Sequence, residues 1–546
     1  MGARLKYAFD NLMSRGGASV FLALMVLFVG AILLMSCLRL IANLVIPQES
    51  MEVLQNQWWV TFLQITDAGA VAEDTDSNFL HRIVGIISIF LGLVLFSSLV
   101  AFITSQFEET LARMRKGKSE VVEKNHTLIL GFGERVLEII RELILANESE
   151  KRAAVVVLSN HEKDEMDDFF REKIEKRKTT RIITRSGSTS SVNSLKRVGI
   201  TRAKSVIILN DAPGDSDSAG KEIADARVLK TIMAVITCCG EEDMPPIVAE
   251  LHHPQKQALA LKISENVSVI DVQSVLAKLM VQTSRISGLA QVYDQMVGFA
   301  GNEFYFYCPP GGWGGLNYND LVFHFHTCCV LGVRYEDGRL ELNPGSGTIL
   351  RDKDELILLA EDDSTIKLSR RKFSAQTLNT RPADSLEMVV EKQLIVGWNQ
   401  KAGIIVDEYS KYLVKGSAID LVINEKSDVV IREFKKVKGK YPDIQFRLLV
   451  ADIRDLHTIT RLKPDTYDNV LILTGDGGEA ELRDSETIAK LLEFRHFFRS
   501  LNKDNIKTQL ITEVADSENI EVVQDTGVKD FLISNQFVSR IYAQVS

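Results

Sequence analysis

Two long runs without a charged residue constrain what this chain can fold into. They cover residues 16–38 and 83–107, and a helix needs about 20 apolar residues to cross a bilayer. We therefore predict two membrane-spanning helices, over 19–46 and 81–108, after a cytoplasmic segment at 1–18. A cleaved signal peptide is the alternative for the first run, but its apolar stretch is longer than the roughly 7–15 residues typical of one.

The flanking charges predict the orientation of the two helices. Basic residues precede the first run and follow the second, whereas no Lys or Arg lies between Arg39 and Arg82. Lys and Arg are retained on the cytoplasmic side of a membrane. We expect a multi-pass protein in a lipid bilayer with both termini in the cytoplasm. The basic residues are Arg4, Lys6, Arg15, Arg113, Arg115, Lys116 and Lys118.

The segment between the two runs, residues 47–80, contains a short aromatic, apolar stretch that begins near Asn56 and is too short to cross a bilayer. A re-entrant helix is the structure open to such a stretch at membrane depth. Helix, short helix, filter and helix is the layout of one subunit of a tetrameric cation channel. The predicted selectivity filter is Thr66, Asp67, Ala68, Gly69 and Ala70, with Asp67 supplying one carboxylate per subunit. The alternative is a solvated extracellular loop in which Asp67 is simply an exposed acid.

Two glycines lie in the second run. A glycine inside a helix lowers the cost of bending, so Gly92, the more central, and Gly85 are predicted gating hinges. Glycine also permits close packing between membrane helices, and that alternative stays open.

The remaining residues predict α/β domains. After a linker at 109–125, an apolar strand at 126–130 leads into Gly131-Phe132-Gly133 and a helix, and strands and helices then alternate through 126–299. The same pattern repeats over 392–546. We predict tandem Rossmann-like domains with doubly wound parallel sheets, joined by a small α+β lobe at 300–370 and a linker at 371–391. Strand candidates in the lobe are 303–307, 321–325, 330–344 and 354–362, with a hairpin signal at Glu336-Asp337-Gly338. A second lobe is not expected within this sequence, which ends at Ser546.

The first turn of the first repeat is an incomplete dinucleotide motif. Gly131 and Gly133 fit it, but Val136 occupies the third glycine position and the second strand ends in Leu158-Ser159-Asn160, without an acid for the ribose. NAD is therefore not expected.

Other functions are also disfavoured. The net charge of −9, with no basic run that contains aromatic residues, argues against nucleic-acid binding. The sequence has no P-loop and no nucleophile elbow, so we do not expect an enzyme. The stretch from His324 through His326 and Cys328 to Cys329 puts three possible ligands on one strand face, but a zinc site needs a fourth. The spacing also fits no zinc finger, and structural burial is the preferred interpretation.

Specific segments resemble the CASTOR/POLLUX family of ion channels, whose gating rings contain RCK (regulator of potassium conductance) domains. They are HTLILGFGERV, RSGS, KSVIILNDAPGDSDSAGKEIADARVLKT, LMVQTSRISGLAQVYDQMVGF, NEFYFY, ELNP and LILLAEDD, and they span residues 120–365. Asp67-Ala68-Gly69 is also similar to the family's filter, whereas Ala70 and Val71 depart from it. The plant members have further membrane helices upstream that this sequence lacks, so we expect a bacterial-type member in the plasma (inner) membrane.

The resemblance implies a homotetramer in which Ca²⁺ binding changes the shape of a cytosolic ring. Calcium prefers six to eight oxygen ligands, and an acidic loop follows the predicted strand at 204–211. The predicted ligands are Asp211, Asp215, Asp217, Asp225 and Glu250. A solvated acidic turn is the alternative. The expected permeant ion is K⁺ or Ca²⁺, or both.

Two other functions are alternatives to a channel. In the first, the two helices only anchor a nucleotide- or ion-sensing regulatory subunit of a separate transporter. In the second, the chain is a membrane-bound NAD-dependent enzyme, which the incomplete dinucleotide motif disfavours.

Overall fold

The structure is a computed structural model, and it divides into two compact units, Met1–Gly117 and Lys118–Ser546. It describes residues 17–46, 57–75, 77–115, 117–133, 135–210, 218–240, 243–286, 288–299, 301–369, 389–475, 480–501, 507–514 and 531–546.

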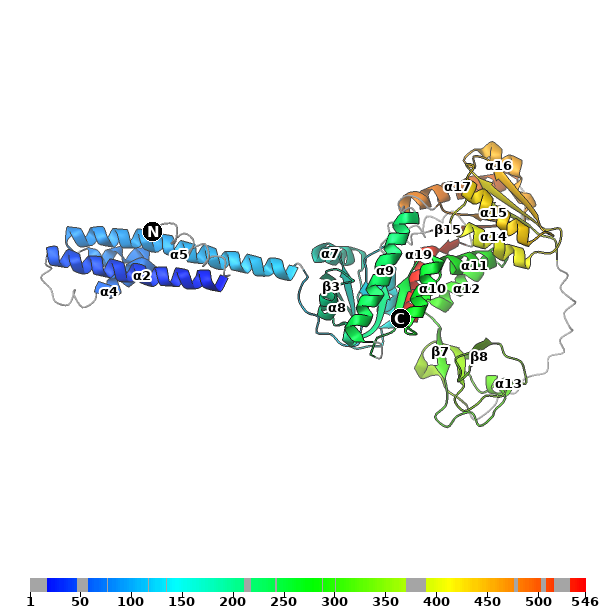
Figure 1. Ribbon diagram of the computed structural model, residues 1–546, viewed down its shortest axis with the longest axis horizontal. Coiled ribbons are helices and arrows are strands. Elements are labelled where there is room, and N and C mark those ends of the chain that lie inside the picture. The colour runs from blue at the N-terminus through cyan, green and yellow to red at the C-terminus, as the bar shows by residue number, and fades with distance from the viewer. Residues whose placement is uncertain are drawn as a thin grey trace. The chain divides into compact units, whose positions relative to one another are not determined.

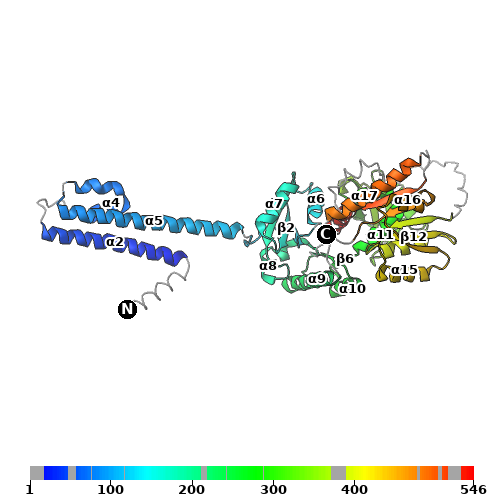
Figure 2. The same cartoon turned by 90° about the horizontal axis from the view of Figure 1, so that it is seen from above.

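The first unit consists of two long helices and a short one. Helices α2 (Gly17–Val45) and α5 (Phe79–Arg115) lie side by side, and the short helix α4 (Gln57–Thr66) contacts both (Figures 1 and 2). A 3₁₀ helix, η1 (Ala68–Asp74), follows α4. Large apolar side chains cover the outside of the long helices, and by length and composition both are able to cross a membrane. The two predicted spans are therefore found as helices, and α5 continues beyond the expected end.

The second unit begins with a six-stranded parallel sheet in the order β3-β2-β1-β4-β5-β6. Strands β1 and β2 are buried along their whole length because helices cover both faces of the sheet, which explains their continuous apolar sequences. The strands are β1 (His126–Leu130), β2 (Ala153–Ser159), β3 (Thr180–Ser186), β4 (Ala203–Ile208), β5 (Ile247–Glu250) and β6 (Val267–Ile270). The helices are α6 (Val136–Ala146), α7 (Lys163–Lys173), α8 (Val192–Arg197), η2 (Ile200–Arg202), α9 (Ser218–Cys239) and α10 (Pro254–Ile263).

Two helices, α11 (Val272–Arg285) and α12 (Leu289–Val297), lead to a small lobe with an antiparallel sheet in the order β7-β10-β8-β9. Its buried core includes Trp313, Val333 and Leu358. The elements are β7 (Glu303–Tyr307), α13 (Tyr318–Val322), β8 (Cys329–Arg334), β9 (Leu340–Leu342), β10 (Glu355–Ala360) and η3 (Asp363–Thr365).

The strand predicted at 321–325 is wrong. The side chain of Asn317 accepts a hydrogen bond from the backbone nitrogen of Asn319 at 2.9 Å and so caps α13. Tyr318 and Leu321 are buried one helical turn apart, and only Phe325 forms an isolated bridge, with Leu368. The local cap and the i, i+3 spacing therefore prevail over the apolar, β-prone composition of this segment.

The second Rossmann-like domain repeats the first, with the order β13-β12-β11-β14-β15-β16 and all neighbours parallel. The strands are β11 (Lys392–Val396), β12 (Ala418–Ile423), β13 (Gln445–Val450), β14 (Asn469–Ile472), β15 (Gln509–Val514) and β16 (Phe531–Ile533). The helices are α14 (Ala402–Tyr412), α15 (Asp428–Lys440), α16 (Leu456–Leu462), η4 (Pro464–Thr466), α17 (Ala480–Ser500) and α19 (Ser534–Val545).

The two Rossmann-like domains share one hydrophobic core cluster. The last helix, α19, packs on α6 of the first domain, and α11 packs on α14 of the second. The hydroxyl of Tyr409 lies 2.5 Å from the hydroxyl of Ser284, and both residues are buried. The tandem domains thus form one packed body.

Candidate functional site

The predicted filter residues follow α4 directly. The hydroxyl of Thr66 donates to the carbonyl oxygen of Phe62 at 2.8 Å, which keeps this residue at the end of the helix. Asp67 is exposed and caps η1, because one of its carboxylate oxygens accepts from the backbone nitrogen of Gly69 at 2.8 Å. The backbone nitrogen of Ala70 donates to the Asp67 carbonyl at 3.1 Å, so Ala68, Gly69 and Ala70 begin a 3₁₀ turn. An exposed carboxylate therefore stands at the end of the short helix.

A buried polar network joins the three helical segments next to this turn. Arg39 of α2 has 1% of its surface exposed and donates to Gln64 of α4 and to Asp74 of η1. The side-chain nitrogen of Gln64 also donates to Asp74 at 2.7 Å. The arginine and the carboxylate are both buried and form an ion pair. The network fixes the segment that contains the predicted filter at its C-terminal end.

The network was not predicted from the sequence, although the sequence contains one signal for it. Arg39 lies inside α2 and is followed by six further helical residues, so it is a charge within an otherwise apolar helix. A charged residue in such a position is expected to face a polar partner inside the protein. The partners, Gln64 and Asp74, lie 25 and 35 positions further along the chain, so the sequence around Arg39 could not identify them.

The two predicted hinge glycines both lie where another segment approaches α5 closely. A Cβ on Gly85 would overlap the carboxylate of Asp74, and a Cβ on Gly92 would overlap the backbone of Ile65 in α4. Close approach thus gives both glycines a packing role. Their hinge role stays a prediction.

The predicted calcium ligands divide into two groups. Asp211, Asp215 and Asp217 lie outside the described residues. Asp225 of α9 is fully buried and accepts from the side-chain nitrogen of Asn210 at 2.8 Å, from the backbone nitrogens of His252 and His253 at 2.9 Å each, and from Nδ1 of His253 at 2.8 Å.

Glu250, at the end of β5, lies at the same sheet edge. It accepts from the backbone nitrogen of Asn210 at 3.1 Å and is ion-paired with Arg135. Asp225 and Glu250 therefore meet around Asn210, at the start of the acidic loop, but both carboxylates already have protein donors. Within the described ranges, no group of three or more His, Cys, Asp or Glu side chains is arranged to hold a metal.

His252 follows this edge and titrates abnormally. Burial lowers its pKa from 6.5 to about 4, although the nearby Asp225 carboxylate acts in the opposite direction. The imidazole is therefore neutral at physiological pH.

The incomplete dinucleotide motif forms only part of a nucleotide site. Gly131 has a positive φ of 118°, and a Cβ there would lie 3.1 Å from the carbonyl oxygen of Leu209. A cleft of about 200 Å³ next to it is lined mainly by Ser, Thr and Asn side chains and Arg227. Gly133 has only an ordinary contact at 3.5 Å, and Val136 is buried in the core. The first turn has Rossmann geometry, but an acid for a ribose is missing where β2 ends at Ser159.

The three possible zinc ligands His324, His326 and Cys328 do not share a strand face, because β8 begins only at Cys329. Nδ1 of His324 lies 2.8 Å from the carbonyl oxygen of Ser369. That expected common face is therefore wrong, and the reason is the turn that follows α13.

Two family models match the α/β part of the chain. One, described as Castor and Pollux, part of voltage-gated ion channel, matches residues 273–376. The other, described as the calcium-activated potassium channel slowpoke-like RCK domain, matches residues 122–257.

Curated relatives extend the similarity into the first unit, Met1–Gly117, which contains α2, α4 and α5 and is called the membrane-type unit below. The chain is 26% identical over 524 residues to the probable ion channel SYM8 of Pisum sativum, covering 89% of this chain and 57% of the relative. It is 26% identical over 530 residues to the ion channel CASTOR of Lotus japonicus, covering 89% of this chain and 60% of the relative. The resemblance to the CASTOR/POLLUX family is confirmed. These CASTOR/POLLUX relatives are named as ion channels and not as enzymes.

The chain spans less than two thirds of the length of these CASTOR/POLLUX relatives. A solved structure, the human SLO3 gating ring, matches with a TM-score of 0.50 and 13% identity over 77% of this chain and 81% of that chain. This likeness shows a shared fold, so the prediction of tandem RCK-like Rossmann domains is confirmed as a fold.

Proposed function

We propose that this chain is one of four identical subunits of a cation channel gated by a cytosolic ring of RCK-like domains. The observation that carries the proposal is the short helix α4, which packs against both long helices and presents the exposed Asp67 at its end. A pair of helices that served only as an anchor would need neither feature. The relatives named as ion channels, which match 89% of the chain, support the same function.

Four copies of the segment from Thr66 to Ala70 would form the filter around a common axis. A ring of four Asp67 carboxylates attracts cations and rejects anions. K⁺ and Ca²⁺ are the proposed permeant ions. We place the protein in the plasma membrane with both termini in the cytoplasm, in line with the basic flanks.

Regulation by Ca²⁺ is the second part of the proposal. The acidic loop begins at the carboxyl edge of a parallel sheet, where ligands of α/β folds bind. Asn210 is fixed there by Asp225 and Glu250, so that edge is rigid up to the start of the loop. The proposed ligands are Asp211, Asp215 and Asp217, joined by Glu250 if it exchanges Arg135 for the ion. Binding opens the pore only if Ca²⁺ prefers the open ring.

The decisive experiment is single-channel recording from the purified full chain in planar bilayers, with and without millimolar Ca²⁺ on the cytosolic side. We expect unitary cation currents whose selectivity changes in Asp67→Asn. Asp76→Asn, which removes an acid from the same loop outside the predicted filter, is the control and should leave selectivity unchanged. Silence from folded, tetrameric protein under every condition would favour a membrane-anchored regulatory subunit instead.

A further inference from the structure

Each of the two Rossmann-like domains has an aromatic residue directly after the glycine that follows its first strand. Gly131 and Gly397 end the first strand of each sheet, have φ angles of 118° and 94°, and would each bring a Cβ to 3.1 Å from a carbonyl oxygen of the neighbouring strand's end. The residue that follows is Phe132 in the first domain and Trp398 in the second. These two side chains are therefore structural equivalents.

In the first domain, other rings fill the space around this aromatic side chain. The ring centroid of Phe132 lies 5.1 Å from that of His161, 5.2 Å from that of Phe169 and 5.7 Å from that of Phe170. His161 precedes α7 and the two phenylalanines lie on it. These rings therefore occupy the space beside Phe132, between the first turn and α7.

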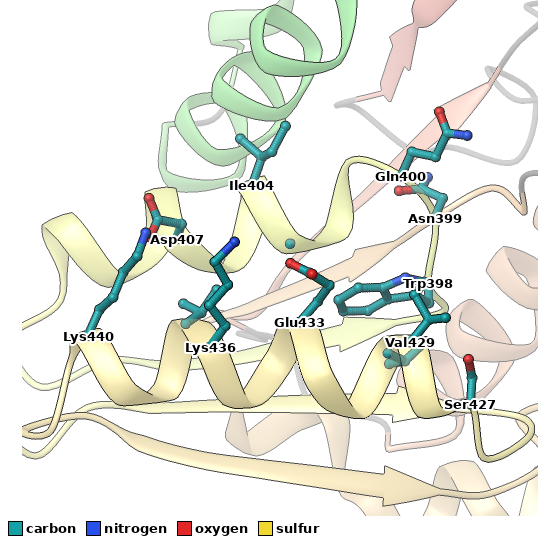
Figure 3. A pocket seen from close by; sticks show the side chains of 13 residues that line it. Trp398, Asn399, Gln400, Ile404, Asp407, Ser427, Val429, Glu433, Lys436 and Lys440 are labelled. Atoms are coloured by element: carbon teal, nitrogen blue, oxygen red, sulfur yellow. The ribbon is translucent and has the colours of Figure 1, made fainter. Parts of the chain in front are cut away.

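In the second domain, the corresponding space is open. Helix α15 replaces α7 and contributes Val429, Val430 and Glu433 to the lining. Its own aromatic residue, Phe434, packs on Phe446, and no ring stacks on Trp398 in the part of the chain that the structure describes. Trp398 packs on the core cluster and also lines a cavity of about 600 Å³ between α14 and α15 (Figure 3). This volume lies within the range of small-molecule sites.

The charged side chains of the cavity are ordered along α15. Lys440 is paired with Asp407 at 2.9 Å and closes the end far from the indole. Glu433 and Lys436 project from α15 toward α14, with Glu433 closer to Trp398 (Figure 3). Neither forms an ion pair with another described residue. A ligand therefore meets, in order, an aromatic face, a carboxylate and an ammonium group.

We propose that this cavity binds a planar, amino-bearing heteroaromatic molecule that carries an anionic group, which is the chemistry of a purine mononucleotide. The ring stacks on Trp398 and takes the place of the rings that surround Phe132. Its amino group donates to Glu433, and its phosphate accepts from Lys436. The cavity begins just past the carboxyl ends of β11 and β12, at Trp398 and Ser427, and runs along the groove between α14 and α15. No residue of β14 lines it, whereas the usual dinucleotide site of this fold lies in the crevice between the ends of the strands that correspond to β11 and β14.

Gly403 allows a sharp test, because it lines the cavity within α14 and a Cβ there would meet nothing within 4 Å. In Gly403→Leu the new Cβ meets open space, the remaining side-chain atoms take up volume at the cavity wall, and the helix propensity improves. The probes are AMP and adenosine, titrated calorimetrically into the full-length protein. We expect one AMP site per chain in the wild type and no measurable binding in Gly403→Leu.

A matched pair of lysines tests the charge. Both lysines are exposed, but only Lys436 lines the cavity, and its neighbour Lys435 does not. Lys436→Met should weaken AMP binding by about tenfold, the loss of one hydrogen bond to a charged group, and should leave adenosine binding unchanged. Lys435→Met should change neither.

Three results would overturn the proposal. They are no binding of AMP to folded wild-type protein, AMP binding that persists in Gly403→Leu and so belongs to another site, and equal effects of Lys435→Met and Lys436→Met. The titration requires no ion current, so the outcome is independent of the proposed channel function.

Discussion

The side-chain nitrogen of Gln64 lies 2.7 Å from the carboxylate of Asp74, which joins the end of α4 to the end of η1 across the segment that holds Asp67. Arg39 donates to both partners from α2. The position of the predicted filter thus depends on a buried cation that belongs to a different helix.

Arg39→Met should strongly destabilise the membrane-type unit. The substitution leaves Asp74 buried without its cation, and breaking a buried ion pair in this way costs about 3–5 kcal/mol. We expect a large fall in the thermal midpoint at which the purified assembly dissociates, together with loss of current.

Arg82→Met is the matched control for this prediction. Arg82 is exposed and donates to two backbone carbonyl oxygens, that of Ser77 at 3.0 Å and that of Thr75. Its removal should lower the midpoint much less. Equal midpoints for the two variants would show that the buried network contributes no particular stability.

Gly92→Ala separates the two interpretations of this glycine. If close packing is its main role, the added methyl group forces α4 away from α5, and the protein loses thermal stability. If Gly92 is only a hinge, the protein stays stable and the open probability changes. We expect loss of stability, because the methyl group would overlap the Ile65 backbone and not a movable side-chain end.

The control is Gly30→Ala in α2, where a Cβ would meet nothing within 4 Å. There the exchange should be neutral or stabilise the helix by up to about 1 kcal/mol. A stable Gly92→Ala protein with altered gating would contradict our expectation and favour the hinge.

The sequence was informative where structure follows from local composition and period. Strands such as β2 are continuous apolar runs, and α4 is recognisable because ten residues are too few to span a membrane. Contacts between residues far apart in the sequence could not be predicted from it. The ion pair of Arg39 and Asp74, and the contact of α19 with α6 across 398 positions, depend on the completed fold. The start of α13 was missed because a single cap at Asn317 prevailed over the β-prone composition of the residues that follow.

The depressed pKa of His252 predicts a pH dependence of stability. The unfolded chain takes up a proton on this side chain near pH 6.5, whereas the folded protein resists it until about pH 4 because the imidazole is buried. Because the unfolded chain binds this proton more readily, the free energy of unfolding falls as the pH falls from 6.5 toward 4. Above pH 6.5, His252 causes no such loss of stability.

His252→Gln should flatten the fall of the thermal midpoint over this pH interval, followed by tryptophan fluorescence of the full chain. The exposed His457, next to the N-cap of α16, is the control, and His457→Gln should leave the slope as in the wild type. Identical slopes in wild type and His252→Gln would exclude a linkage through this residue.

Arg540 of α19 holds the two Rossmann-like domains together. Its Nε donates to Glu142 of α6 at 2.8 Å, its Nη1 donates to the carbonyl oxygen of Asp294 of α12 at 3.1 Å, and it is also ion-paired with the Asp294 side chain. The side chain of Glu142 is 4% exposed, so Arg540→Met leaves a buried carboxylate without its cation. The loss is expected to be about 3 kcal/mol or more.

This free energy should appear as local opening of the contact between α19 and α6. We expect amide hydrogen exchange in α19 to accelerate by roughly a hundredfold in Arg540→Met, since each 1.4 kcal/mol corresponds to about a factor of ten. Arg454→Met, which removes an exposed arginine paired only locally with Asp452 at 3.0 Å, should leave exchange in α19 unchanged. If α19 exchanges at the wild-type rate in Arg540→Met, apolar packing by residues such as Phe537 and Tyr542 is sufficient to hold the two domains together.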